Sequence, residues 1–244
     1  MNFIVEDYSN LFFNRFENFK KSKNIINSKD ILSFWLKNYI QDTDEEIFNL
    51  QKESYKKHGM TFKDYPLENV FPYFIDDFNK MRTAADNLKT ILEDLEDKIN
   101  TLVEEDGKVY IVIYVGAGVG AGSVTKYKDR PAILFGLENI ANLDWYDMET
   151  IKSLAYHEIG HVIHMLEREK IKADFNDKED KIWFRLYLEG MAQRFEHIIQ
   201  GKDTWHMDSG KGDNWKNWIE NNYEYICETL YKRVVNENHK LSDL

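Results

Sequence analysis

Apolar and polar positions divide the first hundred residues into helical segments. In "DILSFWLKNYI" (30–40) and "DEEIFNLQKESYKK" (44–57), apolar side chains recur every three or four positions, which is typical of helices. A break follows, where Gly59, Pro66 and Pro72 interrupt the period. Beyond it, residues 78–105 keep the helical period over a longer stretch. We therefore expect several helices followed by one long amphipathic helix.

The pattern changes after residue 107. "KVYIVIYV" (108–115) and "PAILFG" (131–136) are rich in β-branched and aromatic residues, which predicts two strands. A helical period returns over residues 148–167, 181–200 and about 215–235. This order of elements predicts an α+β fold, mainly helical, with a small β-sheet.

Composition and charge exclude some classes of function. The chain is 43% hydrophobic and 14% aromatic, as expected for a folded globular protein. Its formal net charge of −11, without a stripe of Lys and Arg, argues against a nucleic-acid partner.

Cysteine content and apolar runs bear on the compartment. Cys227 is the only cysteine, so the chain has neither an internal disulfide nor a cysteine-based zinc cluster. Glu6 and Asp7 stand where a signal peptide would carry positive charge. The longest apolar stretch, residues 109–122, is too short and too rich in glycine to span a bilayer. We expect a soluble, cytoplasmic protein with no membrane partner.

The segment "SLAYHEIGHVIHMLER" (153–168) contains the pattern His-Glu-x-x-His. On a helix, His157 and His161 lie one turn apart on the same face, where both rings can reach one tetrahedral metal ion. Glu158 then projects to the side on which a metal-bound water could lie. The opposite face of this helix is predicted to be its core stripe: Ile151, Ala155, Ile159, Val162 and Leu166.

A third metal ligand is expected from a later helix. A metzincin would have Gly at position 164 and His at 167, but this chain has His164 and Glu167. Glu189 in "WFRLYLEGMAQRFEHII" is the better candidate, because a buried carboxylate is costly unless a cation stabilises it. Gly190 beside it would allow a close backbone approach. The predicted core stripe of this helix is Phe184, Leu188, Met191, Phe195 and Ile198.

A simpler alternative for Glu189 is an ion pair within its own helix. Arg185 and Arg194 lie four residues before it and five residues after it. If Glu189 pairs with one of them, it is a structural residue and no third ligand remains on this helix.

With "HEIGH" followed by "EGMA", residues 78–201 resemble gluzincins, zinc metallopeptidases with His-Glu-x-x-His on one helix and a Glu ligand on another. The likeness is greatest to a family of predicted zinc-dependent proteases of uncharacterised function. It implies that His157, His161 and Glu189 bind Zn²⁺ and that Glu158 is the general base. It also implies a zincin-like catalytic domain over residues 76–244, after an N-terminal helical region over residues 1–75.

The chain differs from gluzincins in a residue that would support the metal ligands. Many gluzincins have an Asp four residues after the ligand Glu, which orients a ligand histidine, whereas this chain has Gln193. Support for the ligands must then come from another residue. His164 could be such a residue, a competing ligand or a core histidine. An oxyanion donor is also needed, and the candidates are His206, Tyr223, Tyr225 and Tyr231.

Two further motifs invite functional interpretations. "GAGVGAG" (116–122) resembles a dinucleotide loop, but no helix opens after it to bind a phosphate, so a hairpin or substrate-edge loop is expected. "FGLEN" (135–139) is weakly similar to an aminopeptidase motif whose Glu binds a free peptide N-terminus, which would give that role to Glu138.

The sequence thus predicts a zinc-dependent metallopeptidase that acts on a peptide or protein substrate. Two alternatives stay open. One is a regulatory metallopeptidase specific for a single protein partner. The other is a non-catalytic protein in which a metal ion or a hydrogen-bond network only stabilises the fold.

Overall fold

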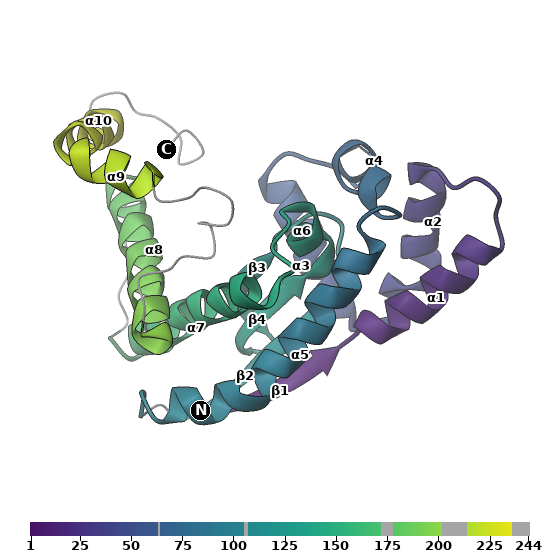
Figure 1. Ribbon diagram of the computed structural model, residues 1–244, viewed down its shortest axis with the longest axis horizontal. Coiled ribbons are helices and arrows are strands. Elements are labelled where there is room, and N and C mark those ends of the chain that lie inside the picture. The colour runs from purple at the N-terminus through teal and green to yellow at the C-terminus, as the bar shows by residue number, and fades with distance from the viewer. Residues whose placement is uncertain (63, 105–106, 172–177, 202–213, 236–244) are drawn as a thin grey trace.

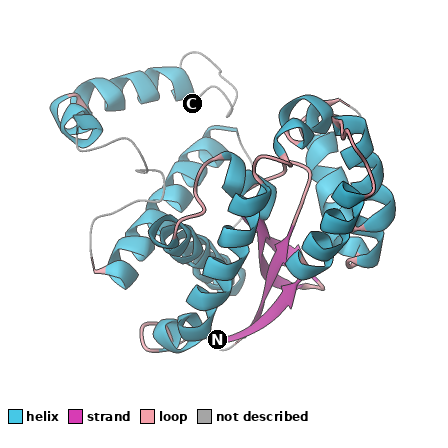
Figure 2. Cartoon of the chain, turned by 45° about the vertical axis from the view of Figure 1, so that its right-hand side comes forward, coloured by secondary structure: helices cyan, strands magenta, loops and turns pink. Residues whose placement is uncertain are grey.

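The computed structural model describes the chain except for residues 63, 105–106, 172–177, 202–213 and 236–244 (Figure 1). The fold is α+β and mainly helical, with one small mixed sheet, as predicted. Figure 2 shows helices on both sides of the four strands. Within the described part of the chain, no helix is both long and apolar enough to cross a membrane.

The sheet has the strand order β1-β2-β4-β3. β1, β2 and β4 are parallel, and β3 pairs with β4 in antiparallel orientation and lies at an edge. Val109 faces Phe3 in the register of β1 and β2, and Gly122 faces Phe135 in that of β3 and β4. The bounds are β1 Asn2–Asp7, β2 Lys108–Tyr114, β3 Gly122–Tyr127 and β4 Arg130–Gly136.

Two of these strands, β2 and β4, were predicted, whereas β1 and β3 were not. β1 lies in a region that we predicted to be helical. Its sequence, "NFIVED", was not recognised as a strand because it has too few apolar residues for a strand pattern. Its conformation depends on pairing with β2, which lies about a hundred residues away in sequence. Long-range pairing of this kind outweighs local propensity.

The N-terminal helices begin at polar caps. Asn27 accepts a hydrogen bond from the backbone of Asp30, whose side chain in turn accepts one from the backbone of Asn27. Asp44 caps the next helix by accepting a hydrogen bond from the N–H of Glu46. The helices are α1 Ser9–Lys21, α2 Ser28–Asn38, α3 Glu45–Lys57 and α4 Tyr65–Asn69, with single 3-10 turns at Ile40–Asp42 and Phe71–Tyr73.

The long helix α5 (Phe78–Asn100) contacts α1, α6 (Leu137–Asn142) and α7 (Met148–Ile171). α7 contacts β3 and β4. Asp147 begins α7, because its carboxylate accepts the N–H groups of Glu149 and Thr150. The predicted core stripe of α7 is correct: Ile151, Ala155, Ile159 and Val162 are buried and Leu166 is partly buried.

Three helices follow: α8 (Lys178–Gln200), α9 (Asn214–Asn221) and α10 (Tyr223–Val235). The sequence predicted one final helix near residues 215–235, and the structure divides it at Asn222. α8 packs on α7 and leads away from the sheet towards α9 and α10 (Figure 1).

One apolar cluster fills the interior. It includes side chains from the N-terminal helices, such as Phe12 and Trp35, together with Ile111 of β2, Leu88 of α5 and Ile159 of α7. Residues 1–75 and the following part of the chain therefore share a core, and β1 joins them through the sheet.

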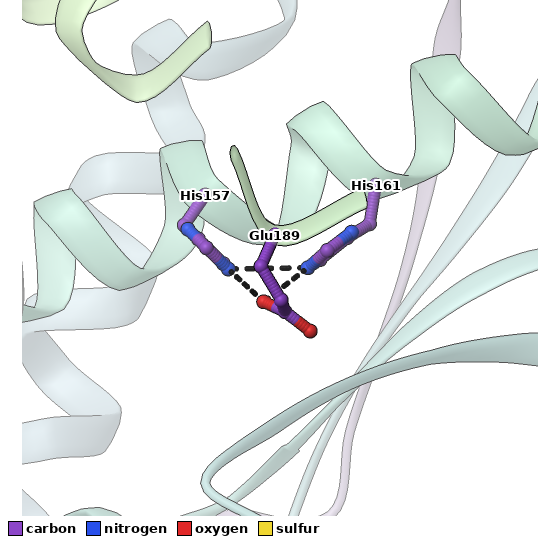
Figure 3. Close-up of side chains that lie close together, drawn as sticks. All are labelled: His157, His161 and Glu189. Atoms are coloured by element: carbon purple, nitrogen blue, oxygen red, sulfur yellow. Dashed lines mark hydrogen bonds and ion pairs between the residues drawn. The ribbon is translucent and has the colours of Figure 1, made fainter. Parts of the chain in front are cut away.

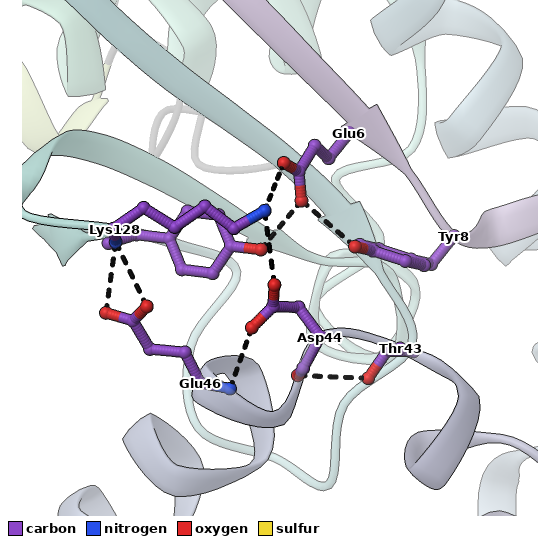
Figure 4. A network of polar contacts seen from close by, with 7 residues as sticks. Glu6, Tyr8, Thr43, Asp44, Glu46 and Lys128 are labelled. Atoms are coloured by element: carbon purple, nitrogen blue, oxygen red, sulfur yellow. Dashed lines mark hydrogen bonds and ion pairs between the residues drawn. The ribbon is translucent and has the colours of Figure 1, made fainter.

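A polar network also joins the two parts (Figure 4). Lys128 stands at the β3–β4 turn in a left-handed conformation with φ of 51°. Its ammonium group lies 2.6 Å from Glu6 of β1 and 3.1 Å from Asp44, and its backbone N–H donates to Glu46. Burial alone would raise the pKa of Glu6, but hydrogen bonds from Lys128, Tyr127 and Tyr8 outweigh it and lower that pKa.

Candidate metal centre

Helices α7 and α8 approach closely at Gly160. A Cβ atom at this position would lie 2.8 Å from the Cα of Ala192, so only glycine fits there without a shift of the helices. We expected this close approach at Gly190, which is wrong, because a Cβ at Gly190 would meet nothing within 4 Å. The crossing at Gly160 brings His157 and His161 next to Glu189, which lies one turn before Ala192.

The three predicted ligand side chains converge at this crossing (Figure 3). The Nε2 atoms of His157 and His161 are 3.1 Å apart, and each lies 3.4 Å from Oε2 of Glu189. Bonds of 2.0–2.2 Å in a tetrahedron place ligand atoms about 3.3 to 3.5 Å apart. Two imidazoles and one carboxylate are a common donor set for zinc, so both spacing and chemistry fit such an ion.

The charge on Glu189 is stabilised by its two neighbours. Contacts with His157, and then with His161, lower the pKa of the Glu189 carboxyl group, so it is ionised near neutral pH. The side chain of His157 is buried, but that of Glu189 is 53% exposed, so the expectation that Glu189 is a buried carboxylate is wrong. Glu189 therefore contacts the two histidines, and not Arg185 or Arg194 as in the alternative considered above.

Glu158 lies beside the ligands but takes no part in the cluster. Its carboxyl group packs against β3, where a Cβ at Gly122 would come within 2.5 Å of Oε1. Burial raises the pKa of Glu158 to about 7, with the His161 charge lowering it and the Glu189 charge raising it. A carboxylate with this pKa can accept and release a proton near neutral pH.

These side chains open into a cleft of about 1230 Å³. Its walls come from α7, from α8, from β3 and from the loop before β3, with further residues from the ends of α3 and α6. Its charged and histidine lining residues are Lys57, His157, Glu158, His161, His164, Arg168, Arg185 and Glu189.

The carboxylate of Glu196 on α8 lies behind the ligands. This residue was not predicted from the sequence. It is fully buried, and its Oε2 lies 3.8 Å from Nδ1 of His157, on the side of the ring away from the cluster. Gln200 donates to Oε1 of Glu196 at 3.1 Å and also to the hydroxyl of Ser153 on α7. Gln193, which stands where gluzincins have an Asp, lies 3.4 Å from Glu196.

The cause of this omission is an error in the predicted core stripe of α8. Ile198 was expected to be buried but is 53% exposed. The buried positions are Ile182, Ala192, Glu196 and Ile199, which lie on the Glu189 side of the helix. Counting helical turns from Glu189 would have placed Glu196 on the face towards α7.

His164 lines the cleft but lies outside the ligand cluster. Its buried ring lies 5.7 Å from the ring of Phe184 and 5.5 Å from that of Tyr187, both on α8. Burial lowers the pKa of His164, and the charges of Arg168 and His161 lower it further. His164 is therefore neutral near neutral pH.

The three oxyanion candidates that the structure describes do not line the cleft. Tyr223, Tyr225 and Tyr231 are exposed on α10 and are absent from the described lining of the cleft. His206 lies outside the described residues.

Backbone N–H groups of the glycine-rich segment (116–122) donate hydrogen bonds to side chains from other parts of the chain. Glu138 accepts the N–H groups of Gly116 and Gly118 at 2.6 and 2.9 Å, and Gln51 accepts that of Ala117. Burial raises the pKa of Glu138 to about 7, although these hydrogen bonds lower it. No helix follows the segment, as predicted, but the expected hairpin is not formed there: β2 and β4 are parallel, the segment leads into β3, and the hairpin turn lies between β3 and β4. Glu138 is buried there and does not line the cleft.

Comparisons of the chain with protein-family models, with curated proteins and with solved structures give no significant match. We therefore infer a function from the geometry of this site and from the chemistry of its residues.

Proposed function

We propose that the protein is a zinc-dependent metallopeptidase. One observation carries the proposal: the ligand atoms of His157, His161 and Glu189 form a triangle with edges of 3.1, 3.4 and 3.4 Å at the wall of a cleft. Glu158 supplies a second, buried carboxyl group directly beside it.

In the proposed reaction, zinc bound by these three side chains supplies a Lewis acid that activates water and polarises the substrate carbonyl group. Glu158 accepts the proton of the attacking water and passes it to the leaving amine. Its raised pKa suits both steps, because the group must take up and release a proton within one cycle. The Glu196 carboxylate, 3.8 Å from Nδ1 of His157, favours through its charge the ring orientation in which Nε2 points towards Glu189.

A purely structural metal site is the less favoured alternative. Structural zinc sites are usually closed by four protein ligands. Among the described residues, the cluster has three, and Glu189 is half exposed at the cleft. A fourth position for water or substrate is typical of catalytic zinc sites.

The test compares zinc-loaded wild type with Glu158→Gln, using a mixed peptide library and mass spectrometry. We expect the substitution to lower kcat/KM by roughly 10²- to 10⁴-fold, the usual contribution of a general base. Zinc content should be unchanged, because Glu158 is not a ligand. Glu167→Gln, an exposed carboxylate on the same helix, is the matched control and should retain activity.

Two results would contradict this assignment. Retained cleavage by Glu158→Gln would remove Glu158 from the mechanism, and loss of zinc would make it a ligand. A fully zinc-loaded wild type that cleaves no library peptide would overturn general peptidase activity and favour a peptidase restricted to one protein partner.

A further inference from the structure

Glu138 is a buried carboxyl group that the proposed reaction does not use. It lies in the first turn of α6, which follows β4 directly, and is only 3% exposed. Its Oε2 accepts the N–H of Gly116 at 2.6 Å, and its Oε1 accepts that of Gly118 at 2.9 Å. The two oxygens thus bind two different N–H groups. An amide side chain cannot replace this arrangement, because it has a single acceptor oxygen.

Two side chains of α3 bind the residue between these glycines. Gln51 accepts the N–H of Ala117 at 3.0 Å, and the hydroxyl group of Tyr55 donates to the carbonyl oxygen of the same residue. Both side chains are buried. Buried backbone groups are costly to separate from their partners, because water does not replace the lost hydrogen bonds. Residues 116–118 are therefore held in a fixed position relative to α3 and α6.

The other end of the glycine-rich segment forms part of the cleft wall next to Glu158. Ala121 and Gly122 line the cleft, and the carbonyl oxygen of Ala121 accepts the N–H of Gly136, the last residue of β4, at 3.0 Å. Gly122 lies so close to Glu158 that a Cβ at this position would overlap the carboxyl group. The position of Gly122 therefore limits where this carboxyl group can lie.

Pairing within the sheet holds Gly122 from one side. β3 is an edge strand, and β4 is its neighbour among the described strands. Gly122 is the first residue of β3, at the open end of the β3–β4 hairpin, and the ends of elements are where local opening begins. Glu138 follows β4 and binds the segment that precedes β3, so it joins the two chain segments at this open end.

We propose that Glu138 is a positioning residue of the proposed peptidase: it holds the glycine-rich segment and, through Gly122, keeps the carboxyl group of Glu158 beside the proposed metal ligands. The two α3 side chains support the same segment, which gives the N-terminal region a role in the site. This inference rests on the proposed function, because the group that Glu138 positions is the proposed general base.

The first test measures hydrogen exchange in residues 116–122 of the full chain at pH 8. Glu138 is ionised there, because burial raises its pKa to about 7. We expect Glu138→Gln to speed exchange about tenfold or more, since one N–H group loses its acceptor. Glu6→Gln is the matched control: Glu6 also accepts hydrogen bonds within this sheet, but from Tyr127 at the opposite end of β3, so exchange should not change. Unchanged exchange in Glu138→Gln would overturn the proposal.

Tyr55→Phe provides a milder variant in case Glu138→Gln does not fold. It deletes the hydroxyl group that donates to Ala117 and leaves the ring stacked on Phe62. Exchange in residues 116–122 should then rise by about threefold or more. If Glu138→Gln does not fold, wild-type exchange in Tyr55→Phe would overturn the proposal.

A double-mutant cycle separates positioning from a purely structural role. If Glu138 acts through Glu158, Glu138→Gln should lower kcat about tenfold or more, change KM by less than about threefold and leave the zinc content unchanged. In the Glu158→Gln background, the same substitution should change the residual kcat by less than about twofold. Equal factors in the two backgrounds would show that Glu138 stabilises the fold without positioning the base.

A spectroscopic measurement distinguishes failure of this proposal from failure of the peptidase proposal. In protein with carbon-13-labelled glutamate, the carboxyl resonance of Glu158 is the signal that is absent from Glu158→Gln. This resonance should shift in Glu138→Gln and stay in place in Glu6→Gln, whether or not any peptide is cleaved. An unchanged resonance in Glu138→Gln would overturn the positioning role and leave the peptidase proposal intact.

Discussion

Glu158 and Glu189 lie in one cleft, yet their surroundings shift their pKa values in opposite directions. Burial raises the pKa of Glu158, whereas contacts with two imidazoles lower that of Glu189. Such a division is expected when one carboxylate must exchange protons and the other must stay ionised.

Peptide cleavage should depend on pH through Glu158. Protonated Glu158 cannot accept a proton from water, so kcat/KM should fall as pH decreases below about 7, approaching tenfold per pH unit. Zinc content measured at each pH separates this effect from release of the metal. A flat profile between pH 5 and 7 with zinc retained would be inconsistent with Glu158 as the base.

Glu196 is expected to influence zinc affinity although it does not touch the metal. Carboxylates behind a ligand histidine fix its orientation, and their loss typically weakens metal binding 10- to 100-fold. We expect Glu196→Gln to weaken zinc binding by about that factor, measured by competition with a chromophoric chelator.

Gln200→Ala serves as the control for a purely structural role of Glu196. It removes the hydrogen bonds to Glu196 and Ser153 but leaves the carboxylate next to His157. The control should lower the melting temperature of zinc-free and zinc-loaded protein alike. If Glu196→Gln behaves in the same way, with zinc affinity intact, Glu196 only joins the two helices.

At the scale of elements, the site depends on how closely α7 and α8 cross. Gly160→Ala introduces a Cβ 2.8 Å from the Cα of Ala192, so the helices must separate. We expect a loss of roughly 1 to 3 kcal/mol in the free energy of unfolding, as for other overpacked contacts. Zinc affinity should fall as well, because Glu189 moves away from the histidines.

Gly190→Ala is the matched substitution on the partner helix. A Cβ there meets nothing within 4 Å, and alanine is a better helix former, so stability should rise by about 0.5 to 1 kcal/mol. Chemical denaturation and zinc titration of both variants provide the comparison. Equal effects of the two substitutions would show that the crossing at Gly160 does not position the site.

Several elements could be predicted from local patterns. The core stripe of α7 and the positions of His157, Glu158 and His161 follow from the three-to-four spacing of its apolar residues and from the His-Glu-x-x-His pattern. The stripe of α8 was misjudged because apolar residues occur around much of that helix, and only contact with α7 selects the buried face. β1 could not be predicted either, since its pairing with β2 is a long-range contact.

At the scale of the whole molecule, the N-terminal region and the rest of the chain share one core and one sheet. β1 pairs with β2, Phe12 and Trp35 join the central apolar cluster, and Lys128 contacts both Glu6 and Asp44. The division at residue 75 was implied by the resemblance to gluzincins, which begins near residue 78, but such a resemblance cannot reveal which surfaces a region buries against its neighbours.

Residues 76–244 are therefore not expected to fold alone. Without residues 1–75, the edge of β2 and part of the core would be exposed, which favours aggregation. We expect this fragment to lack a cooperative thermal transition by circular dichroism, whereas the full chain has one. A soluble fragment that unfolds cooperatively and binds zinc would instead establish two independent domains.

The measurement that tests the central claim most directly is the metal content of the purified full chain, determined by elemental analysis and confirmed by zinc titration. We predict one zinc ion per chain in the wild type and in Glu167→Gln. In Glu189→Gln we predict a large loss of affinity, because the third ligand is removed. Absence of a stoichiometric divalent metal ion from the wild type, or equally tight zinc binding by Glu189→Gln, would contradict the proposed metal centre.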